Sequence, residues 1–254
     1  MRDDQVNQCI DYIRFTMEME GSELADGTSD VLESILTGDA DADSVVADYI
    51  VRQGLETSYE TGHDEMGTYE DSRALVNYFN IHDKARLRTI EHFLVNVRTA
   101  QLFACPVSGN PTFQYLCQIH SRLFGDIYPS AGRIRTSEAS KRKDFCRVQF
   151  IERCSSELFT RLSKDDYLRK IDDIGDFAND LAFYMGEAEA LHPFRDGNGR
   201  AIRFYFNRLV QEAGYLLHWS KADPDRMLEA SIAAIDGDYQ ALVDVLGEIL
   251  EPCG

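Results

Sequence analysis

Apolar side chains recur at three- and four-residue spacing in three runs near the start of the chain, and a glycine follows each run: Gly21, Gly38 and Gly54. This spacing gathers the apolar side chains on one face of a helix, and glycine directly after such a run is a helix stop signal. The segment 55–68 that follows is polar and has no apolar period, which is typical of a linker. The pattern therefore predicts a small module of three helices, residues 1–54, ahead of a larger domain.

Helical periodicity also dominates the rest of the chain. Amphipathic runs predict helices at 85–103, 112–124, 148–162, 177–191, 200–214 and 223–235. The segment between Tyr128 and Arg147 differs, because short extended runs alternate there with small and polar residues, and it predicts a β-hairpin or flap. The expected fold class is therefore all-α: a helical bundle with one small β-hairpin flap, preceded by the three-helix module.

Composition indicates a folded protein and narrows its partners. The chain of 254 residues is 44% hydrophobic, enough for a core, and its net charge of −18 repels nucleic-acid phosphate. Its one conspicuous basic run, residues 141–143, is typical of a solvated turn. The polar N-terminus is not a signal peptide, and no apolar run approaches the about 18 residues of a membrane span. The six cysteines lack the spacing of a metal site or a disulfide framework. We expect a cytoplasmic protein that binds neither nucleic acid nor membrane.

The sequence LHPFRDGNGR, residues 191–200, concentrates residue types that carry chemistry. Its Gly-Asn-Gly run, residues 197–199, leads into a helix, so that unpaired backbone N–H groups and the helix dipole form an anion site there. Arg200 and Arg203 then fall in the first turn of this helix, where acidic side chains are the usual preference. Two arginines at this place make sense if a polyphosphate binds in front of them.

Two further side chains of the same stretch suit group transfer. Asp196 is a hard oxygen ligand beside the anion site, suited to Mg²⁺ that also binds phosphate. His192 can take a proton from an incoming hydroxyl group near neutral pH. A lone histidine is more often a buried structural residue, but here a base, a metal ligand, an anion site and two arginines occur together. The combination indicates transfer of a phosphorus-containing group to a hydroxyl group.

This stretch resembles, residue for residue, the Fic motif HPFx(D/E)GN(G/K)R, and Arg203 matches an arginine that commonly follows it. Residues 123–136 resemble the run ahead of the flap in that family, and residues 226–246 resemble its C-terminal helices. The resemblance covers residues 69–251, which we expect to form a Fic domain with a mostly α-helical fold.

The resemblance implies transfer of AMP from ATP to a Ser, Thr or Tyr hydroxyl group of a target protein, with pyrophosphate as the leaving group. His192 would be the general base, and Asp196 would hold Mg²⁺ on the phosphates. Gly197, Asn198 and Gly199 would form the anion hole, and the arginine that follows them would clamp phosphates. Glycine at position 199 favours adenylylation, because relatives with lysine there include a kinase that binds ATP the other way round.

The segment from Ser137 to Arg147 resembles the flap of this family, which pairs with the backbone of the target by β-augmentation. The candidate target-docking residues are Ser137, Ser140, Lys141, Lys143 and Phe145. The target itself stays open. Relatives that carry an antitoxin module often modify topoisomerase subunits, and self-modification is an alternative.

The sequence TMEMEG, residues 16–21, provides a second resemblance. Thr16 and Glu20 share a helix face, and Gly21 ends the helix. Such a short pattern is common by chance, and by itself it favours a plain helix end with a solvated acid. Directly ahead of a Fic domain, however, it resembles the inhibitory motif (S/T)xxxE(G/N), and the module resembles a Fic antitoxin fused to its toxin. The resemblance implies autoinhibition, in which Glu20 pairs with Arg203 and misaligns the α-phosphate of ATP.

Two other functions stay open at this point. A Fic enzyme with different chemistry would use another nucleotide, transfer a phosphocholine-type group or remove AMP, since the transferred group depends on nucleotide orientation and pocket shape. A non-catalytic module would use the flap and groove for partner contact, although the intact motif argues against it.

Overall fold

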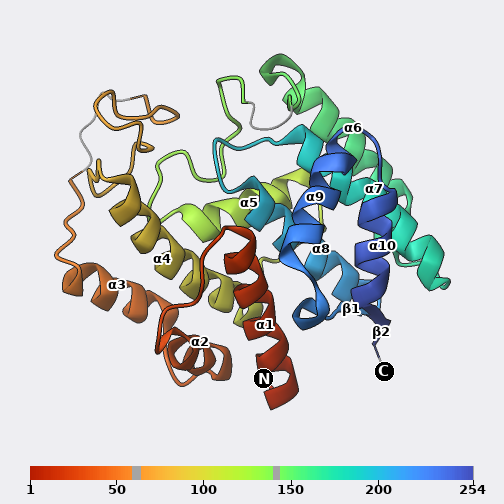
Figure 1. The fold of residues 1–254 in the computed structure, drawn as a ribbon, viewed down its shortest axis with the longest axis horizontal. Coiled ribbons are helices and arrows are strands. Elements are labelled where there is room, and N and C mark those ends of the chain that lie inside the picture. Colours follow the sequence, from red (N-terminus) through yellow and green to blue (C-terminus); the bar gives the residue numbers. More distant parts are fainter. Residues whose placement is uncertain (59–63, 140–143, 254) are drawn as a thin grey trace.

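The computed structural model describes residues 1–58, 64–139 and 144–253, and this part of the chain is mostly helical (Figure 1). Its helices are α1 (Asp3–Met19), α2 (Thr28–Thr37), α3 (Ala42–Arg52), α4 (Lys84–Ala104), α5 (Phe113–Phe124), α6 (Ile151–Lys164), α7 (Ile174–Leu191), α8 (Asn198–Glu212), α9 (Pro224–Ile235) and α10 (Gln240–Ile249). Short 3-10 helices occur at η1 (Val148–Phe150), η2 (Asp166–Leu168) and η3 (Trp219–Lys221). The all-α prediction is confirmed. None of these helices is both long and apolar enough to cross a membrane.

One small antiparallel sheet accompanies the helices in the described residues, but it does not lie in the predicted flap. Its strands are β1 (Tyr215–Leu217) and β2 (Leu250–Pro252), which tie the end of α8 to the end of α10. Of the described flap residues, Asp144 takes part in an isolated β-bridge, and residues 137–139 and 145–147 belong to no strand. Its candidate docking residues Ser140, Lys141 and Lys143 lie outside the described residues.

A buried arginine holds the described ends of the flap segment. The side chain of Arg135 donates hydrogen bonds to the carbonyl oxygen of Ser137 (2.9 Å) and to that of Cys146. Arg135 is 1% exposed, so this guanidinium group satisfies backbone carbonyl groups that strand pairing would otherwise satisfy. Side-chain hydrogen bonds of this kind leave no periodic signal in the sequence.

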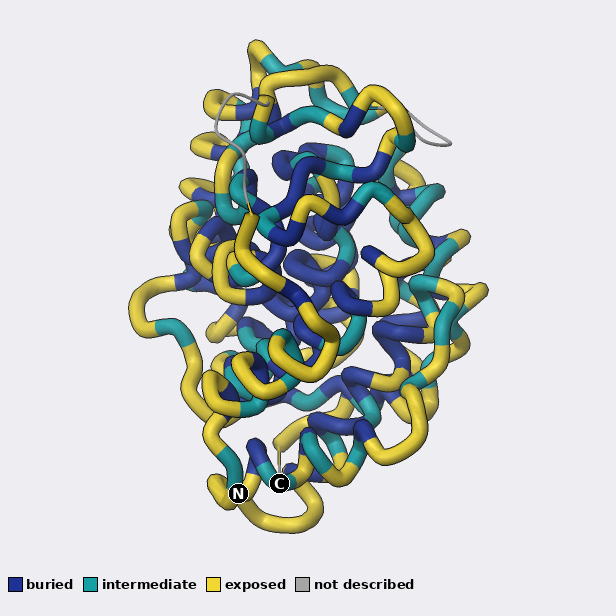
Figure 2. Tube along the Cα trace, turned by 90° about the vertical axis from the view of Figure 1, so that its left-hand side faces the viewer, coloured by how far each residue is buried: buried dark blue, intermediate teal, exposed yellow. Residues whose placement is uncertain are grey.

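Helix α8 runs through the centre of the fold, and α5, α7 and β1 pack against it (Figure 1). Its consecutive aromatic residues Phe204, Tyr205 and Phe206 are buried. A helix with large apolar side chains around most of its circumference must be covered on several sides. Figure 2 shows the buried residues gathered inside the fold and the exposed ones along its outer turns. This packing fixes the N-terminal end of α8, where the motif lies.

Helix α1 belongs to the same core as the rest of the chain. The ring of Tyr12 meets three other aromatic rings edge-on, with 5.3 Å between centroids to Phe103, 6.0 Å to Phe204 and 5.4 Å to Trp219. Helix α1 also packs against α4 and α9, while α2 and α3 pack against α4. The three expected N-terminal helices are therefore present and lie directly on the larger domain. The domain boundary at 54 stays a prediction.

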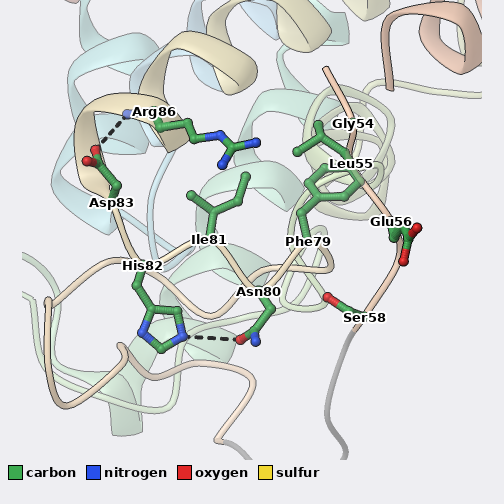
Figure 3. A pocket seen from close by; sticks show the side chains of 10 residues that line it. All are labelled: Gly54, Leu55, Glu56, Ser58, Phe79, Asn80, Ile81, His82, Asp83 and Arg86. Carbon is green, nitrogen blue, oxygen red and sulfur yellow. Dashed lines mark hydrogen bonds between the residues drawn. The ribbon is translucent and has the colours of Figure 1, made fainter. Parts of the chain in front are cut away.

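The described parts of the expected linker are packed at both ends. Figure 3 shows residues 54–58 facing residues 79–86 across a cavity of about 330 Å³. At the other end, Met66 is buried, and its carbonyl oxygen accepts a hydrogen bond from Nε of Arg195 (2.9 Å). The segment therefore contacts both α4 and the motif, which its polar composition did not indicate.

Replacing Tyr12 with alanine is expected to lower the free energy of unfolding by about 3–5 kcal/mol, because it removes a ring buried among three others. Tyr12→Phe keeps this ring and should cost at most about 1 kcal/mol, since the hydrogen bond of the hydroxyl group to a backbone oxygen is long. That bond, to the carbonyl group of Arg200, measures 3.5 Å. Urea unfolding followed by circular dichroism measures both losses. Equal losses in the two variants would contradict the anchoring of α1 by this ring.

Candidate active site

The motif occupies the turn between α7 and α8. His192 caps α7 in a left-handed backbone conformation, with φ of 44°, and donates its backbone N–H to the carbonyl oxygen of Ala188 (3.2 Å). Gly197 precedes α8 and is also left-handed, with φ of 74°. The two residues reverse the chain, so that the side chain of His192 and the first residues of α8 line one cavity. A left-handed conformation is strained for histidine, and such strain is typical of functional sites.

Asn198 holds this turn in shape. Its side-chain amide group donates to the carbonyl oxygen of Phe194 (2.9 Å), and its Oδ1 accepts from the backbone N–H of Phe194 (2.8 Å). Phe194 is fully buried and stacks on the ring of His120, with 3.9 Å between centroids. The side chain of Asn198 therefore forms its hydrogen bonds within the loop, and only the backbone of this residue is available to an anion.

His120, from α5, fixes the position of Asp196. Its Nδ1 accepts the backbone N–H of Gly132 (2.8 Å), so Nε2 carries the proton and donates to the carbonyl oxygen of Asp196 (2.8 Å). Burial lowers the pKa of His120 to about 4, and the ring is neutral near pH 7. The carboxylate of Asp196 accepts the N–H of Gly197 (2.9 Å) and lies at an exposed position. A fixed backbone thus presents an accessible carboxylate beside the start of α8.

Gly197 cannot carry a side chain in this arrangement. A Cβ atom there would lie 2.4 Å from Cζ of Phe124, and the left-handed backbone also favours glycine. On the same ring lies the guanidinium group of Arg200, 4.7 Å from the ring centroid. A cation over an aromatic face is stabilised. The close approach of loop and ring therefore also helps to place Arg200.

Two neighbours orient His192. Its ring stacks on Phe145, with 3.6 Å between centroids and 9° between planes, and its carbonyl oxygen accepts from Nε of Arg135 (2.8 Å). Arg135 is the residue that also holds the ends of the flap segment. Because the side chain of His192 lines a cavity beside Phe145, a hydroxyl group brought to the flap could pass its proton to the imidazole.

Arg200 is buried against a carboxylate that the sequence analysis missed. Its Nη1 lies 2.6 Å from Oε1 of Glu91 on α4, and the hydroxyl group of Tyr128 donates to the same carboxylate. Burial opposes the charge of Arg200, but Glu91, Glu20 and Asp196 together raise its pKa above the usual value. A signal for Glu91 was present, because it lies on the buried face of a helix whose period the sequence shows.

Arg203 is 4% exposed and faces the inhibitory-motif residue Glu20. Its Nη2 lies 3.4 Å from Oε1 of Glu20, and Nε of Arg200 lies 3.8 Å from the same oxygen. The two arginines of the motif therefore share one carboxylate that comes from α1. A Cβ atom on Gly199 would lie 2.8 Å from Nη1 of Arg203, so glycine at that position leaves room for this guanidinium group.

The end of α1 is built to place Glu20. The N–H of Gly21 donates to the carbonyl oxygen of Glu18 (2.8 Å), and that of Ser22 donates to Met17 (3.0 Å). With φ of 68° at Gly21, these two bonds form a Schellman motif, which stops the helix directly after Glu20. Thr16 lies one turn earlier and is 7% exposed. Gly21, the glycine of TMEMEG, is therefore explained by the end of helix α1 itself.

Glu20 lines two cavities. One, of about 370 Å³, also has His192, Gly199, Arg203 and apolar residues of α9 in its wall. The other, of about 380 Å³, has Asp196, Arg200 and basic residues of α4 in its wall. The candidate catalytic residues thus divide between two spaces that meet at one carboxylate.

Comparisons with known proteins agree with this site. The sequence model of the Fic/DOC family matches residues 110–210. The "Probable protein adenylyltransferase y4lH" of Sinorhizobium fredii is 33% identical over 175 residues, which are 68% of this chain and 90% of that protein. The chain belongs to the Fic/DOC family. It is a Fic enzyme, with the motif of residues 192–200 at the start of α8.

Other Fic proteins resemble the chain over a similar length. The "Protein adenylyltransferase VbhT" of Bartonella schoenbuchensis is 33% identical over 181 residues, 71% of this chain but 37% of that longer protein. Among solved structures, the BepC protein of Bartonella tribocorum with bound AMPPNP superposes with a TM-score of 0.67 at 25% identity. That match covers 75% of this chain and 99% of the BepC chain. The helical Fic fold is therefore shown by both sequence and structure.

Gly197→Ala is expected to lower the melting temperature more than Gly214→Ala. Both glycines have a left-handed φ, of 74° and 89°, but a methyl group on Gly214 would meet nothing within 4 Å. Gly214→Ala should carry only the backbone cost of about 1–2 kcal/mol. Gly197→Ala adds the clash with Phe124, and overpacking costs a further ~1–3 kcal/mol. Differential scanning calorimetry compares the two, and equal shifts would contradict the close packing of loop and ring.

Proposed function

We propose that this Fic enzyme transfers AMP from ATP to a hydroxyl group of a target protein and is held inactive by Glu20. The observation that carries the proposal is the convergence of His192, Asp196 and two buried arginines at the start of α8. Two relatives that are 33% identical are named protein adenylyltransferase and probable protein adenylyltransferase, and the similar BepC structure contains bound AMPPNP.

The start of α8 supplies the place for the α-phosphate. Its first backbone N–H groups have no partner within the helix, and the helix dipole favours negative charge there. His192 takes the proton of the target hydroxyl group, whose oxygen attacks the α-phosphorus. The bond from the α-phosphorus to the bridging oxygen breaks, and pyrophosphate leaves with that oxygen. Arg200 and Arg203 stabilise the charge on the phosphates.

Asp196 fits the role of a magnesium ligand. It is an exposed carboxylate whose backbone is fixed by His120, and it lies beside the anion site. Mg²⁺ typically takes one or two carboxylates and completes its shell with phosphate oxygens and water. When bound, the ion would neutralise charge on the phosphates. The contribution of the chain is to hold the carboxylate of Asp196 at the edge of the phosphate site.

The flap segment would bring the target to His192. Phe145 stacks on the imidazole, and Ser137 is tied to the carbonyl group of His192 through Arg135. A target strand laid along this segment would place a side-chain hydroxyl group near His192 without reading much of its sequence. The acceptor is therefore a protein side chain; a topoisomerase subunit and the chain itself are the candidate targets.

The inhibition follows from the position of the Glu20 carboxylate, which Arg200 and Arg203 share. Glu20 contacts Arg203 and approaches Arg200, so its carboxylate occupies the space where phosphate oxygens would contact these arginines. A phosphate displaced by about 1 Å can lose on the order of a hundredfold in rate. Helix α1 is anchored in the core by Tyr12, and it therefore holds Glu20 in place without a second protein.

Glu20→Gly is expected to raise AMP transfer by about a hundredfold, because it frees the arginines for the triphosphate. Transfer of label from α-³²P ATP with Mg²⁺ measures this in a lysate that contains targets. Glu18→Gly is the matched control, since Glu18 is exposed at the same helix end and should leave transfer unchanged. Adding His192→Ala to Glu20→Gly should abolish the label. Equal transfer by wild type and Glu20→Gly would discard the inhibition, and label that survives His192→Ala would discard the base.

Glu91→Gln, in the Glu20→Gly background, is expected to reduce kcat/KM for ATP about tenfold, which is ~1.4 kcal/mol of transition-state stabilisation. The reason is that an uncharged amide holds Arg200 less firmly than the carboxylate does. Tyr128→Phe removes only the second hydrogen bond to Glu91 and should have a smaller effect. Initial rates at several ATP concentrations measure both, with melting temperatures as a folding control. An unchanged kcat/KM in a folded Glu91→Gln protein would contradict this role.

A further inference from the structure

The cavity on the side of Glu20 away from His192 has an unusual charge for this chain. Its wall comes from the N-terminal turns of α4, the turn around Arg73, the motif residues Asp196 and Arg200, and the single residues Glu20 and Tyr128. Lys84 and Arg88 contribute from α4. The chain has a net charge of −18, yet the lysine and arginine side chains that line this cavity of about 380 Å³ outnumber its carboxylates by four to three.

The basic residues of α4 stand where a helix normally carries acids. Lys84 is the first residue of α4, directly after the N-cap Asp83, and the first turn itself contains no acidic residue. Lys84 and Arg88 are four residues apart, so they share one helix face, and Glu91 continues that face toward Arg200. Cations near the positive end of a helix are unfavourable unless an anion compensates them.

Two of the basic residues that line this cavity are without an ion pair in the described part of the chain. Arg73 and Lys84 make no ion pair there, whereas Glu91 is paired with Arg200 and Glu20 with Arg203. Arg73 is exposed and has a left-handed backbone, with φ of 58°, in the turn between Thr68 and Leu75, which form a β-bridge. The turn therefore holds a cation at the cavity at the cost of backbone strain.

The reaction geometry directs a leaving group to this cavity. Phosphoryl-type displacement is roughly in line, so the leaving oxygen departs on the side opposite to the attacking hydroxyl group. The attack comes from the cavity that His192 lines, while Asp196 and Arg200 line the other one. A diphosphate that moves away from the α-phosphorus past Arg200 would therefore meet Arg73 and Lys84.

We propose that this cavity is a polyphosphate-binding site, and that its ligand in the reaction is the pyrophosphate released by AMP transfer. The second half of this statement rests on the proposed function; the first half does not. Arg88 also donates to the carbonyl oxygen of Glu20 and to Oγ of Ser22 (3.2 Å), so it couples the site to the end of α1. Arg73 and Lys84 are the residues that serve the site alone.

Calorimetric titration of the Glu20→Gly chain with inorganic pyrophosphate, without nucleotide, tests the site. Pyrophosphate should bind, and Arg73→Gln with Lys84→Gln should weaken its Kd at least about tenfold, or ~1.4 kcal/mol. The matched control is Arg153→Gln with Lys170→Gln, which removes two exposed charges elsewhere and should change Kd less than about twofold. No binding to the parent chain, or equal weakening by both pairs, would overturn the proposal.

A second arm identifies the source of the ligand. If the site takes the leaving group, added pyrophosphate should inhibit AMP transfer by Glu20→Gly, and the Arg73→Gln, Lys84→Gln chain should need about tenfold more of it. Binding without inhibition would show a site for a free polyphosphate and overturn the link to the reaction. Because the titration needs no turnover, binding with no AMP transfer would refute the proposed function alone. Transfer with no binding would refute this site alone.

Discussion

Two buried guanidinium groups at the positive end of one helix are the constraint on which the rest of this structure depends. Arg200 is 7% exposed and Arg203 4% exposed, both in the first turns of α8. Buried cations at such a place are costly unless carboxylates compensate them. Glu91 compensates Arg200, and Glu20 compensates Arg203. Two buried arginines at the start of a helix suit a polyanion, and the carboxylate of Glu20 lies against both of them.

Most of the surrounding structure serves to hold these groups still. Asn198 and Phe194 lock the turn, and the ring of Phe124 lies under both Gly197 and Arg200. Arg135 links His192 to the flap segment. Each of these contacts joins residues of the motif to a different helix or loop. A preorganised site of this kind needs little rearrangement when charge develops in the transition state.

The sequence predicted the parts that have a local signal. The run 85–103 became α4 (Lys84–Ala104), because its apolar period is long and Asp83 caps its start with a side-chain hydrogen bond to the N–H of Arg86. Helix α7 begins three residues earlier than predicted, at Ile174, because Asp173 accepts the first N–H groups. The motif and Glu20 were found because both have a fixed pattern of neighbours along the chain.

The parts that were missed depend on contacts between distant residues. Glu91 meets Arg200 across 109 positions of the sequence, and Tyr128 meets Glu91 across 37, and no local pattern records that these residues meet. In the sequence, Arg135 is one more basic residue near the flap segment. In the structure it is buried, and its side chain holds the described ends of that segment. The β-hairpin expected in the flap stays a prediction, because residues 140–143 lie outside the described part of the chain; at its described ends, side-chain bonds from Arg135 hold the backbone.

The exchange of Glu20 for phosphate is the central claim, and thermal stability with a non-hydrolysable ATP analogue and Mg²⁺ tests it most directly. Without ligand, Glu20→Gly should melt below wild type, because Arg203 loses its counter-charge. The analogue should then raise the melting temperature of Glu20→Gly by more than that of wild type, since at one ligand concentration the tighter-binding protein gains more stability. Equal rises in the two proteins, or a Glu20→Gly chain as stable as wild type without ligand, would contradict the account.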